Sequence, residues 1–181
     1  MAVREVLLMG HPVLQQRALP VEDIDTLHIQ EILVDMRDTM AELDGAGLAA
    51  PQIGISLRII MFGIAHNPRY PEVEPIAETV LINPEIDVLD DSMEEGWEGC
   101  LSIPGMRGNV PRHSKIRYRG YSVNGERIDR TVDGFHARVV QHEYDHLEGI
   151  LYPQRMIDMS DFGFEQALLK RSDENVATLD S

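Results

Sequence analysis

Apolar residues recur at intervals of three and four positions in two parts of the chain, and this spacing predicts two amphipathic helices. The first helix runs from Asp23 to about Leu43. Its apolar stripe consists of Ile32, Met36, Met40 and Leu43. Asp23 and Asp25 are candidates for its N-cap, because a short acidic side chain can accept hydrogen bonds from the N–H groups of a first turn. The second helix runs over residues 133–149, between an Asp-Gly pair and a glycine.

Short segments between the two helices predict β-strands. Leu57–Ile64 is apolar and rich in β-branched residues, which is typical of a buried strand. Residues 66–75 contain three prolines and are expected to form a loop. Glu78–Ile82 and Glu85–Leu89 are predicted as two separate strands, because an Asn-Pro pair stands between them and proline cannot donate to a β-ladder.

A predicted hairpin completes the pattern. Lys115–Val123 alternates between apolar and polar residues, an Asn-Gly turn follows at 124–125, and Arg127–Val132 is the expected return strand. The strands follow one another along the chain instead of alternating with helices, which favours antiparallel pairing. We therefore predict a single α+β domain in which antiparallel β-sheets pack around a central helix over 133–149.

Composition and charge narrow the class of protein. A chain of 181 residues is long enough for one domain with a sizeable core. Its 16 basic and 31 acidic residues give a net charge of −15, which repels nucleic-acid phosphates and anionic membranes. We therefore expect no direct nucleic-acid binding and no membrane association.

The chain contains no signal-peptide pattern and no stretch near the roughly 20 apolar residues of a membrane span. Its single cysteine, Cys100, excludes an internal disulfide and is in keeping with a reducing compartment. We expect a cytoplasmic protein with one catalytic domain over residues 1–171 and an acidic tail over 172–181 that frays.

The most specific chemical signal is HEYDH at 142–146, within the second predicted helix. Residues four apart lie one above the other on a helix, so the imidazoles of His142 and His146 can bind one metal ion. Glu143 is then placed to reach a metal-bound water, as in HExxH hydrolases. The alternative is a surface helix with two unrelated histidines.

Two histidines leave a catalytic metal site one protein ligand short. No histidine or cysteine follows His146, and the acidic residues there have no matching spacing: Glu148, Asp158, Asp161 and Glu165. Upstream, Cys100 offers a thiolate that suits zinc or ferrous iron, although a lone cysteine is more often a small buried residue. Glu98 and Asp145 are candidates for orienting a ligand imidazole or a pocket group, with a solvated carboxylate as the alternative.

A third segment, GAGLAAPQ at 45–52, combines small residues with a glutamine. Small residues let a backbone approach a ligand closely. The segment lacks the GxxxxGK[ST] pattern of a phosphate-binding loop. Taken alone, it also fits a helix end followed by a flexible loop.

The three segments together resemble the motifs of the peptide deformylase family, which are GxGxAAxQ, EGCLS and HExDH in that order. Here they stand intact as GAGLAAPQ (45–52), EGCLS (98–102) and HEYDH (142–146). The similarity spans roughly residues 3 to 156. It implies a metal-dependent hydrolase that removes the N-formyl group from the initiator methionine of nascent polypeptides.

The resemblance also implies a role for each motif residue. The metal ligands would be Cys100, His142 and His146. The ion would be one divalent metal, ferrous iron in the first place, with nickel or zinc as substitutes. A water activated by the metal would attack the formyl carbon, with Glu143 as general base and then general acid. Gln52 and the backbone N–H of Leu101 would stabilise the oxyanion.

For the substrate, the resemblance implies a peptide that binds as an extended strand. Gly47 and Gly99 match backbone positions near that peptide, and Arg107 matches a basic residue near its main chain. Phe135 and Val139 match positions that line the pocket for the methionine side chain.

The C-terminal part departs from the family pattern. Some members dock on the ribosome through a basic C-terminal helix, but here Lys170 and Arg171 are followed by acidic residues, and FGF at 162–164 does not suit one continuous helix. Ribosome association stays open, and docking through such a helix is not expected. There are three rival interpretations. The first is another metal hydrolase, such as a metallopeptidase, and the second is a metal-dependent binding protein without turnover. The third is a structural zinc domain, which would need a fourth ligand that this chain does not offer.

Overall fold

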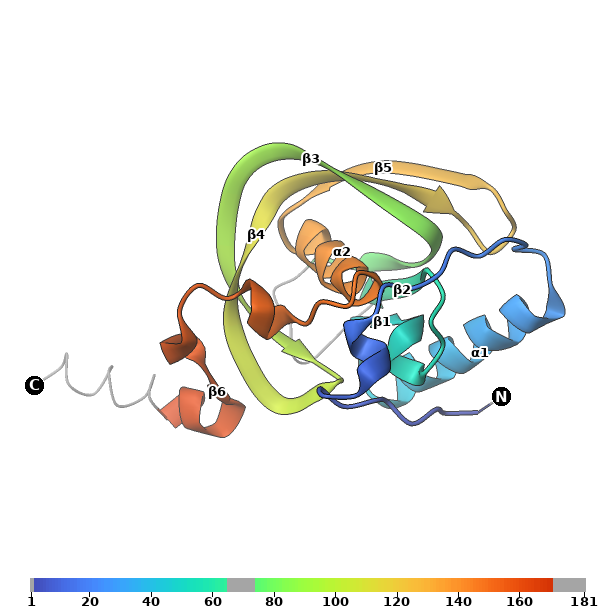
Figure 1. Ribbon diagram of the computed structural model, residues 1–181. Coiled ribbons are helices and arrows are strands. Elements are labelled where there is room, and N and C mark those ends of the chain that lie inside the picture. Colours follow the sequence, from blue (N-terminus) through green and yellow to red (C-terminus); the bar gives the residue numbers. More distant parts are fainter. Residues whose placement is uncertain (1, 65–73, 171–181) are drawn as a thin grey trace, which may run out of the picture.

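The computed structural model describes residues 2–64 and 74–170. These residues form one antiparallel sheet, with strands in the order β1-β2-β3-β4-β5 and β6 paired to β4, and two main helices (Figure 1). The helices are α1 (Leu27–Glu42) and α2 (Gly134–Leu147). The strands are β1 (Gly47–Ala49), β2 (Ile59–Ile64), β3 (Ile76–Cys100), β4 (Ile103–Tyr121), β5 (Arg127–Asp133) and β6 (Phe162–Phe164). The predicted α+β domain with antiparallel sheet around a central helix is confirmed.

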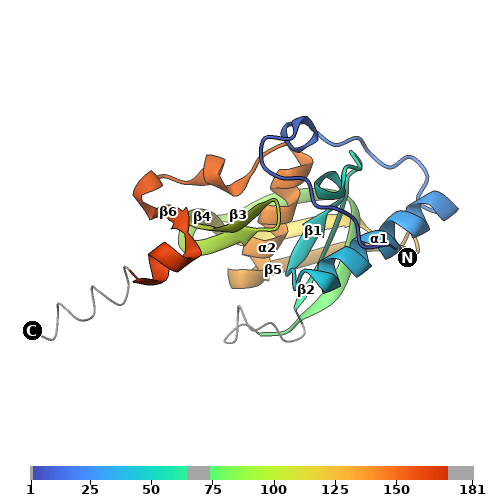
Figure 2. The same cartoon turned by 90° about the horizontal axis from the view of Figure 1, so that it is seen from below.

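Helices cover both faces of the sheet at β1 and β2 (Figure 2). In β2, Ile59 and Met61 belong to the core that α1 closes, whereas Ile60 and Phe62 belong to the core that α2 closes. Successive residues of a strand point to opposite faces, so a strand buried on both sides has to be apolar throughout. This explains why the segment predicted from its unbroken apolar run is a central strand.

The start of α1 differs from the prediction. The helix begins at Leu27, and its N-cap is Thr26, whose hydroxyl accepts a hydrogen bond from the N–H of Ile29 at 3.2 Å. Asp23 instead accepts from the N–H of Asp25 at 3.1 Å, within the preceding loop. The prediction of Asp23 or Asp25 as the cap was therefore wrong, because a local side-chain turn competes for the same acceptor.

The two strands predicted on either side of positions 83–84 are one continuous strand, β3. Asn83 has a positive φ of 51°, and the register against β4 shifts between Ile82 and Glu85. The Asn83 amide bonds both the N–H and the carbonyl of Val21, at 2.8 and 2.9 Å. An irregularity of this kind accommodates Pro84, which has no N–H to donate, without ending the strand.

The strand predicted at Lys115–Val123 is only the second half of β4. Upstream of it, residues 93–100 of β3 and 103–113 of β4 pair with each other as a two-stranded ribbon that ends at the Cys100–Ile103 turn. This ribbon contains glycines, two prolines and several charged residues. It shows no clean alternation of apolar and polar residues, so sequence patterns did not predict it. In Figure 1 the sheet formed by β3, β4 and β5 curves around α2.

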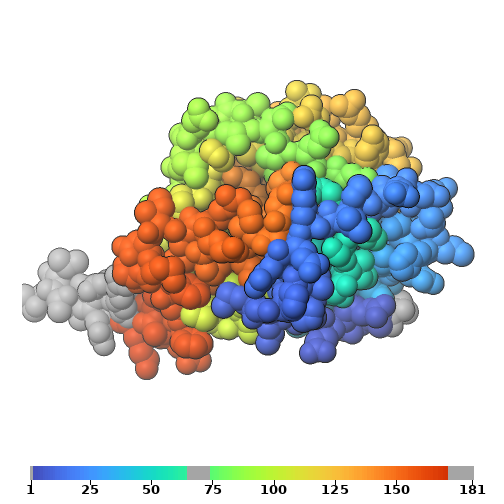
Figure 3. Space-filling view, viewed as in Figure 1, coloured from blue at the N-terminus to red at the C-terminus, as the bar shows by residue number. Residues whose placement is uncertain are grey.

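The N-terminal residues lie across the molecule as an extended segment. The N–H groups of Leu7 and Met9 donate to the carbonyls of Gln52 and Ser102, both at 2.8 Å. Figure 3 shows this segment in blue beside the residues that follow α2 in orange. No helix in the part of the chain that the structure describes is long and apolar enough to cross a membrane. Most of the predicted loop at 66–75 and the acidic tail at 172–181 lie outside that part.

Candidate active site

Three side chains that can bind a metal converge at the tip of the ribbon. Cys100 ends β3, and His142 and His146 lie one turn apart on α2. One ligand atom from each of the three lies within 4.8 Å of the others, and Cys100 Sγ is 3.4 Å from His146 Nε2. The curvature of the sheet over α2 thus brings the thiol to the helical histidine pair.

The surroundings of both imidazoles suit a metal ligand. His142 Nδ1 is 2.8 Å from a Glu98 carboxylate oxygen, which places a proton on Nδ1 and leaves Nε2 to face Cys100. Burial opposes a charge on His142, but hydrogen bonds to Cys100 and Glu98 outweigh it and raise its pKa. A cation bound at Nε2 therefore has to displace the proton on Nε2, while Nδ1 keeps the proton that it shares with Glu98. For His146, burial keeps the pKa well below its usual value, which favours the neutral, metal-binding form.

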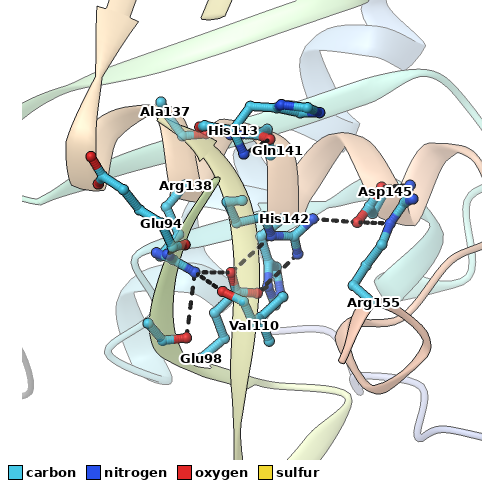
Figure 4. Close-up of polar contacts among 12 residues, drawn as sticks. Glu94, Glu98, Val110, His113, Ala137, Arg138, Gln141, His142, Asp145 and Arg155 are labelled. Carbon is cyan, nitrogen blue, oxygen red and sulfur yellow. Dashed lines mark hydrogen bonds and ion pairs between the residues drawn. The ribbon is translucent and has the colours of Figure 1, made fainter. Parts of the chain in front are cut away.

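A buried network of charges holds Glu98 in place (Figure 4). Arg112 donates to both of its carboxylate oxygens at 2.9 Å, and Arg138 donates to one of them at 3.0 Å. Burial alone would raise the pKa of Glu98, but the bonds from Arg112 and His142 overcome it and hold that pKa far below its usual range. Of the two interpretations of Glu98, orientation of a ligand imidazole is the one the geometry supports.

Asp145 does not contact a ligand imidazole through any hydrogen bond that the structure shows. It accepts from Arg112 at 2.5 Å and from Arg155 at 2.7 Å, and it is buried. Asp145 therefore supports Glu98 indirectly, by holding the opposite side of the Arg112 guanidinium. The alternative of a solvated carboxylate is wrong for both Glu98 and Asp145.

Glu143 lines the cavity, and the residue as a whole is 5% exposed. Its Oε2 has no hydrogen-bond partner in the described part of the chain, and burial raises the pKa of Glu143 to about 7. Gly47 makes this placement possible, because a Cβ there would lie 2.7 Å from Glu143 Cδ. A carboxyl group in these surroundings can accept and release a proton near neutral pH.

Gln52 has a defined amide orientation. Its Oε1 accepts from the N–H of Ala49 at 2.8 Å, so its NH₂ group faces the site. That group donates to Ser102 Oγ at 3.2 Å and lies 3.5 Å from Cys100 Sγ. The GAGLAAPQ segment is thus not a flexible loop: it forms β1 and a 3-10 helix over Ala50–Ile53.

A cavity of about 350 Å³ opens in front of these groups. Every site residue predicted from the sequence lines it, apart from His146, which is 1% exposed and lies behind Cys100. The predicted residues in the lining are Gly47, Gln52, Gly99, Cys100, Leu101, Arg107, Phe135, Val139, His142 and Glu143. The structure therefore brings the three motifs to one cavity.

The sequence interpretation missed several charged residues of the site. Arg138 lines the cavity, and Glu165, which follows β6, forms an ion pair with Arg107 at 2.9 Å on its rim. Arg138 could have been found, because it lies one turn before His142 on the same face of α2. Nothing in the sequence pattern pointed to Arg112, and Glu165 was considered only as a metal ligand, for which it has no matching spacing.

Comparisons with known proteins agree with the geometry. Residues 3–161 match the family described as polypeptide deformylase. The chain is 57% identical to peptide deformylase 1 of Nitrosomonas europaea over 92% of this chain and 94% of that protein. It is 51% identical to peptide deformylase 1 of Bordetella pertussis over 96% of this chain and 98% of that protein.

Solved structures show the same likeness. The class I type b peptide deformylase of Acinetobacter baumannii, in a crystal structure with Met-Ala-Ser bound, superimposes with a TM-score of 0.83 at 38% identity, over 86% of this chain and 99% of that one. The peptide deformylase of Thermotoga maritima gives a TM-score of 0.78 at 34% identity, over 87% and 100%. The chain therefore belongs to the peptide deformylase family and is an enzyme of that class.

Proposed function

We propose that this chain removes the N-formyl group from the initiator methionine of nascent polypeptides, giving formate and a free N-terminus. One observation supports the proposal above all others. Ligand atoms of a thiol and two imidazoles lie within 4.8 Å of one another. Glu143, whose Oε2 has no hydrogen-bond partner in the part of the chain that the structure describes, lines the same cavity as Cys100 and His142. This arrangement suits a metal-assisted hydrolysis.

Cys100, His142 and His146 would hold one divalent metal ion. When bound, the ion supplies Lewis-acid chemistry, which acidifies a water and polarises the formyl carbonyl. Thiolate and imidazole ligands suit ferrous iron, nickel and zinc, and we assign ferrous iron from the family resemblance, with the other two as substitutes. Metal analysis of protein purified without oxygen tests this assignment. A fully active enzyme that contains only zinc would overturn it.

Glu143 takes the proton of the attacking water and passes it to the leaving amine. Its burial, and the lack of a hydrogen-bond partner for Oε2 among the described residues, leave the carboxyl group available for both transfers. Gln52 donates its amide N–H to the oxygen that becomes negative, an orientation supported by its bond from Ala49. The N–H of Leu101, which follows the ligand Cys100, is the second proposed donor.

The peptide would lie as an extended strand along β1, the terminal strand of the sheet path. The Acinetobacter baumannii relative has been crystallised with Met-Ala-Ser, which supports a pocket for methionine. Phe135 and Val139, both in the cavity lining, are proposed to contact the methionine side chain. Gly99 and Arg107 are proposed to lie near the peptide main chain.

The wider context of the enzyme also stays a proposal. We place it in the cytoplasm, with the catalytic domain over residues 1–171. The short strand β6 interrupts the chain at FGF, and residues 165–170 are helical after it. Ribosome association stays open, and we do not propose docking through a basic C-terminal helix.

Product identification distinguishes deformylation from the rival hydrolysis. The metal-loaded protein is incubated with three forms of one methionyl peptide, which carry an N-formyl group, an N-acetyl group or a free amine. We expect mass spectrometry to show loss of the formyl group alone, with the peptide bonds intact. Cleavage of a peptide bond in the free-amine form would favour a metallopeptidase, and no reaction by metal-loaded protein would favour a binding protein.

A further inference from the structure

Arg138 lies in the cavity lining, yet none of the three motifs includes it. It is on the face of α2 that also presents Phe135 and His142 to the cavity, and its side chain is 11% exposed. A charged side chain in this position needs compensation for its burial. The compensation comes entirely from the ribbon, as Figure 4 shows.

The Arg138 guanidinium connects α2 to both strands of the ribbon. It donates to the carbonyls of Glu94 and Gly96 on β3 at 2.5 and 3.4 Å. It donates to the carbonyl of Val110 on β4 at 2.7 Å, and to the Glu98 carboxylate at 3.0 Å. These contacts occupy the guanidinium and direct it away from the role of a substrate-binding cation.

Gly96 provides the space for this guanidinium. A Cβ at position 96 would lie 2.8 Å from Arg138 Cζ and 2.9 Å from one of its terminal nitrogens. The φ of Gly96 is not positive, so the backbone conformation itself tolerates a side chain there. A side chain at this position therefore has to displace the Arg138 guanidinium.

We propose that Arg138 is a positioning residue that, together with Gly96, fixes the ribbon against α2. The ribbon ends in Cys100, whereas the two histidines belong to α2, so the distance between the thiol and the imidazoles depends on how these elements are held together. The same contact sets the width of the cavity between Phe135 and the ribbon. The part of this inference that concerns substrate rests on the proposed function.

A lysine cannot replace Arg138 in this role. Its ammonium group is a compact charge, whereas the planar guanidinium presents several N–H groups in fixed directions. The Arg138 contacts run to three carbonyls and one carboxylate at different points of the ribbon. We therefore expect Arg138→Lys to restore little of the function that Arg138→Met loses.

The test is a double-mutant cycle on metal-loaded, full-length protein. The variants are Arg138→Met, Gly96→Ala and the two combined, with Arg117→Met as the matched control. Arg117 forms an exposed ion pair with Asp129 on β5 and does not line the cavity. The first readout is the rate of metal release to a chelator, and the second is kcat and KM for a formyl-methionyl peptide.

We expect Arg138→Met to release metal about tenfold faster and to raise KM more than it lowers kcat, because residues behind metal ligands typically change affinity by roughly 10–100-fold. Gly96→Ala should reproduce most of this effect in the presence of Arg138. In the Arg138→Met background it should add almost nothing, since the displaced group is then absent. Arg117→Met should release metal at the wild-type rate.

Two results would overturn the inference. One is metal release and KM at wild-type values in Arg138→Met, and the other is an equal effect of Gly96→Ala in both backgrounds. A merely structural role would lower the thermal midpoint without changing metal release far below it. If wild-type protein released no formate, the proposed function would fail, whereas the metal-release cycle would still decide the role of Arg138.

Discussion

Replacing Gly47 with alanine should disable Glu143 without touching a metal ligand. Gly47 lies in β1 with an ordinary strand backbone, since it is not among the residues with positive φ. The added methyl group would meet the Glu143 side chain, with Cγ at 2.8 Å and Cδ at 2.7 Å. Within the protein, the substitution therefore displaces this carboxyl group and does not strain the strand backbone.

The size of the effect follows from these distances. An ordinary contact to a Cβ begins at 3.4 Å, so Glu143 Cδ has to move by about 0.7 Å or more from its present 2.7 Å. A misplacement near 1 Å can cost roughly 10²-fold in rate, and general acid–base transfer as a whole is worth around 10²–10⁴-fold. We expect kcat to fall by about 10²-fold.

The assay is formate release from a formyl-methionyl peptide at saturating concentration, with bound metal measured on the same sample. Gly163→Ala is the matched control, because Gly163 does not line the cavity and the nearest atom to its Cβ would be 3.6 Å away. The control should keep metal and a kcat near wild type. A Gly47→Ala enzyme with unchanged kcat, or one that loses its metal in proportion to its activity, would refute this reasoning.

Three further predictions follow from the site and its supports. Gln52→Leu should keep the metal but lower kcat by roughly 10²–10³-fold in the same formate assay, since one oxyanion donor is lost. Arg112→Met should lower the free energy of unfolding by about 3 kcal/mol in urea titration, because it leaves two buried carboxylates short of a partner. The control Arg117→Met removes only an exposed pair and should lower the free energy of unfolding far less. Burial is the main reason why the pKa of His136 in the folded protein lies below its usual value of 6.5. As the pH falls, the unfolded chain therefore binds a proton at His136 before the folded protein does, and the free energy of unfolding should decrease as the pH drops through 6.5. Thermal midpoints at pH 7.5 and 5.5 should therefore differ less in His136→Asn than in wild type, and an equal difference in both proteins would contradict the assignment.

The parts of the site that depend on local helix geometry could be predicted from the sequence. His142 and His146 are four residues apart, and this spacing alone places both imidazoles on one face of α2. Apart from the family resemblance, Cys100 could be proposed only because the pair lacked a third ligand. Its approach to α2 depends on the curvature of a sheet, which no local pattern encodes.

The ribbon shows why the supporting residues were harder to predict. Its strands are paired mainly with each other, and much of their surface is exposed or charged, so hydrophobic alternation is weak. The partners of Glu98 therefore cannot be predicted until the register of the two strands is known. Gly47 was predicted to contact a peptide backbone, but its second role, making room for Glu143, requires the packing of β1 against α2.

The most direct test of the proposed function is formate release by wild type and Glu143→Gln at equal metal occupancy. The protein is loaded anaerobically with ferrous iron, and the formate released from a formyl-methionyl peptide is measured. We predict stoichiometric formate from wild type and a rate lower by about 10²–10⁴-fold from the variant, with metal content unchanged. Near-normal turnover by Glu143→Gln would contradict the role assigned to this carboxyl group, and no formate from metal-loaded wild type would contradict the function itself.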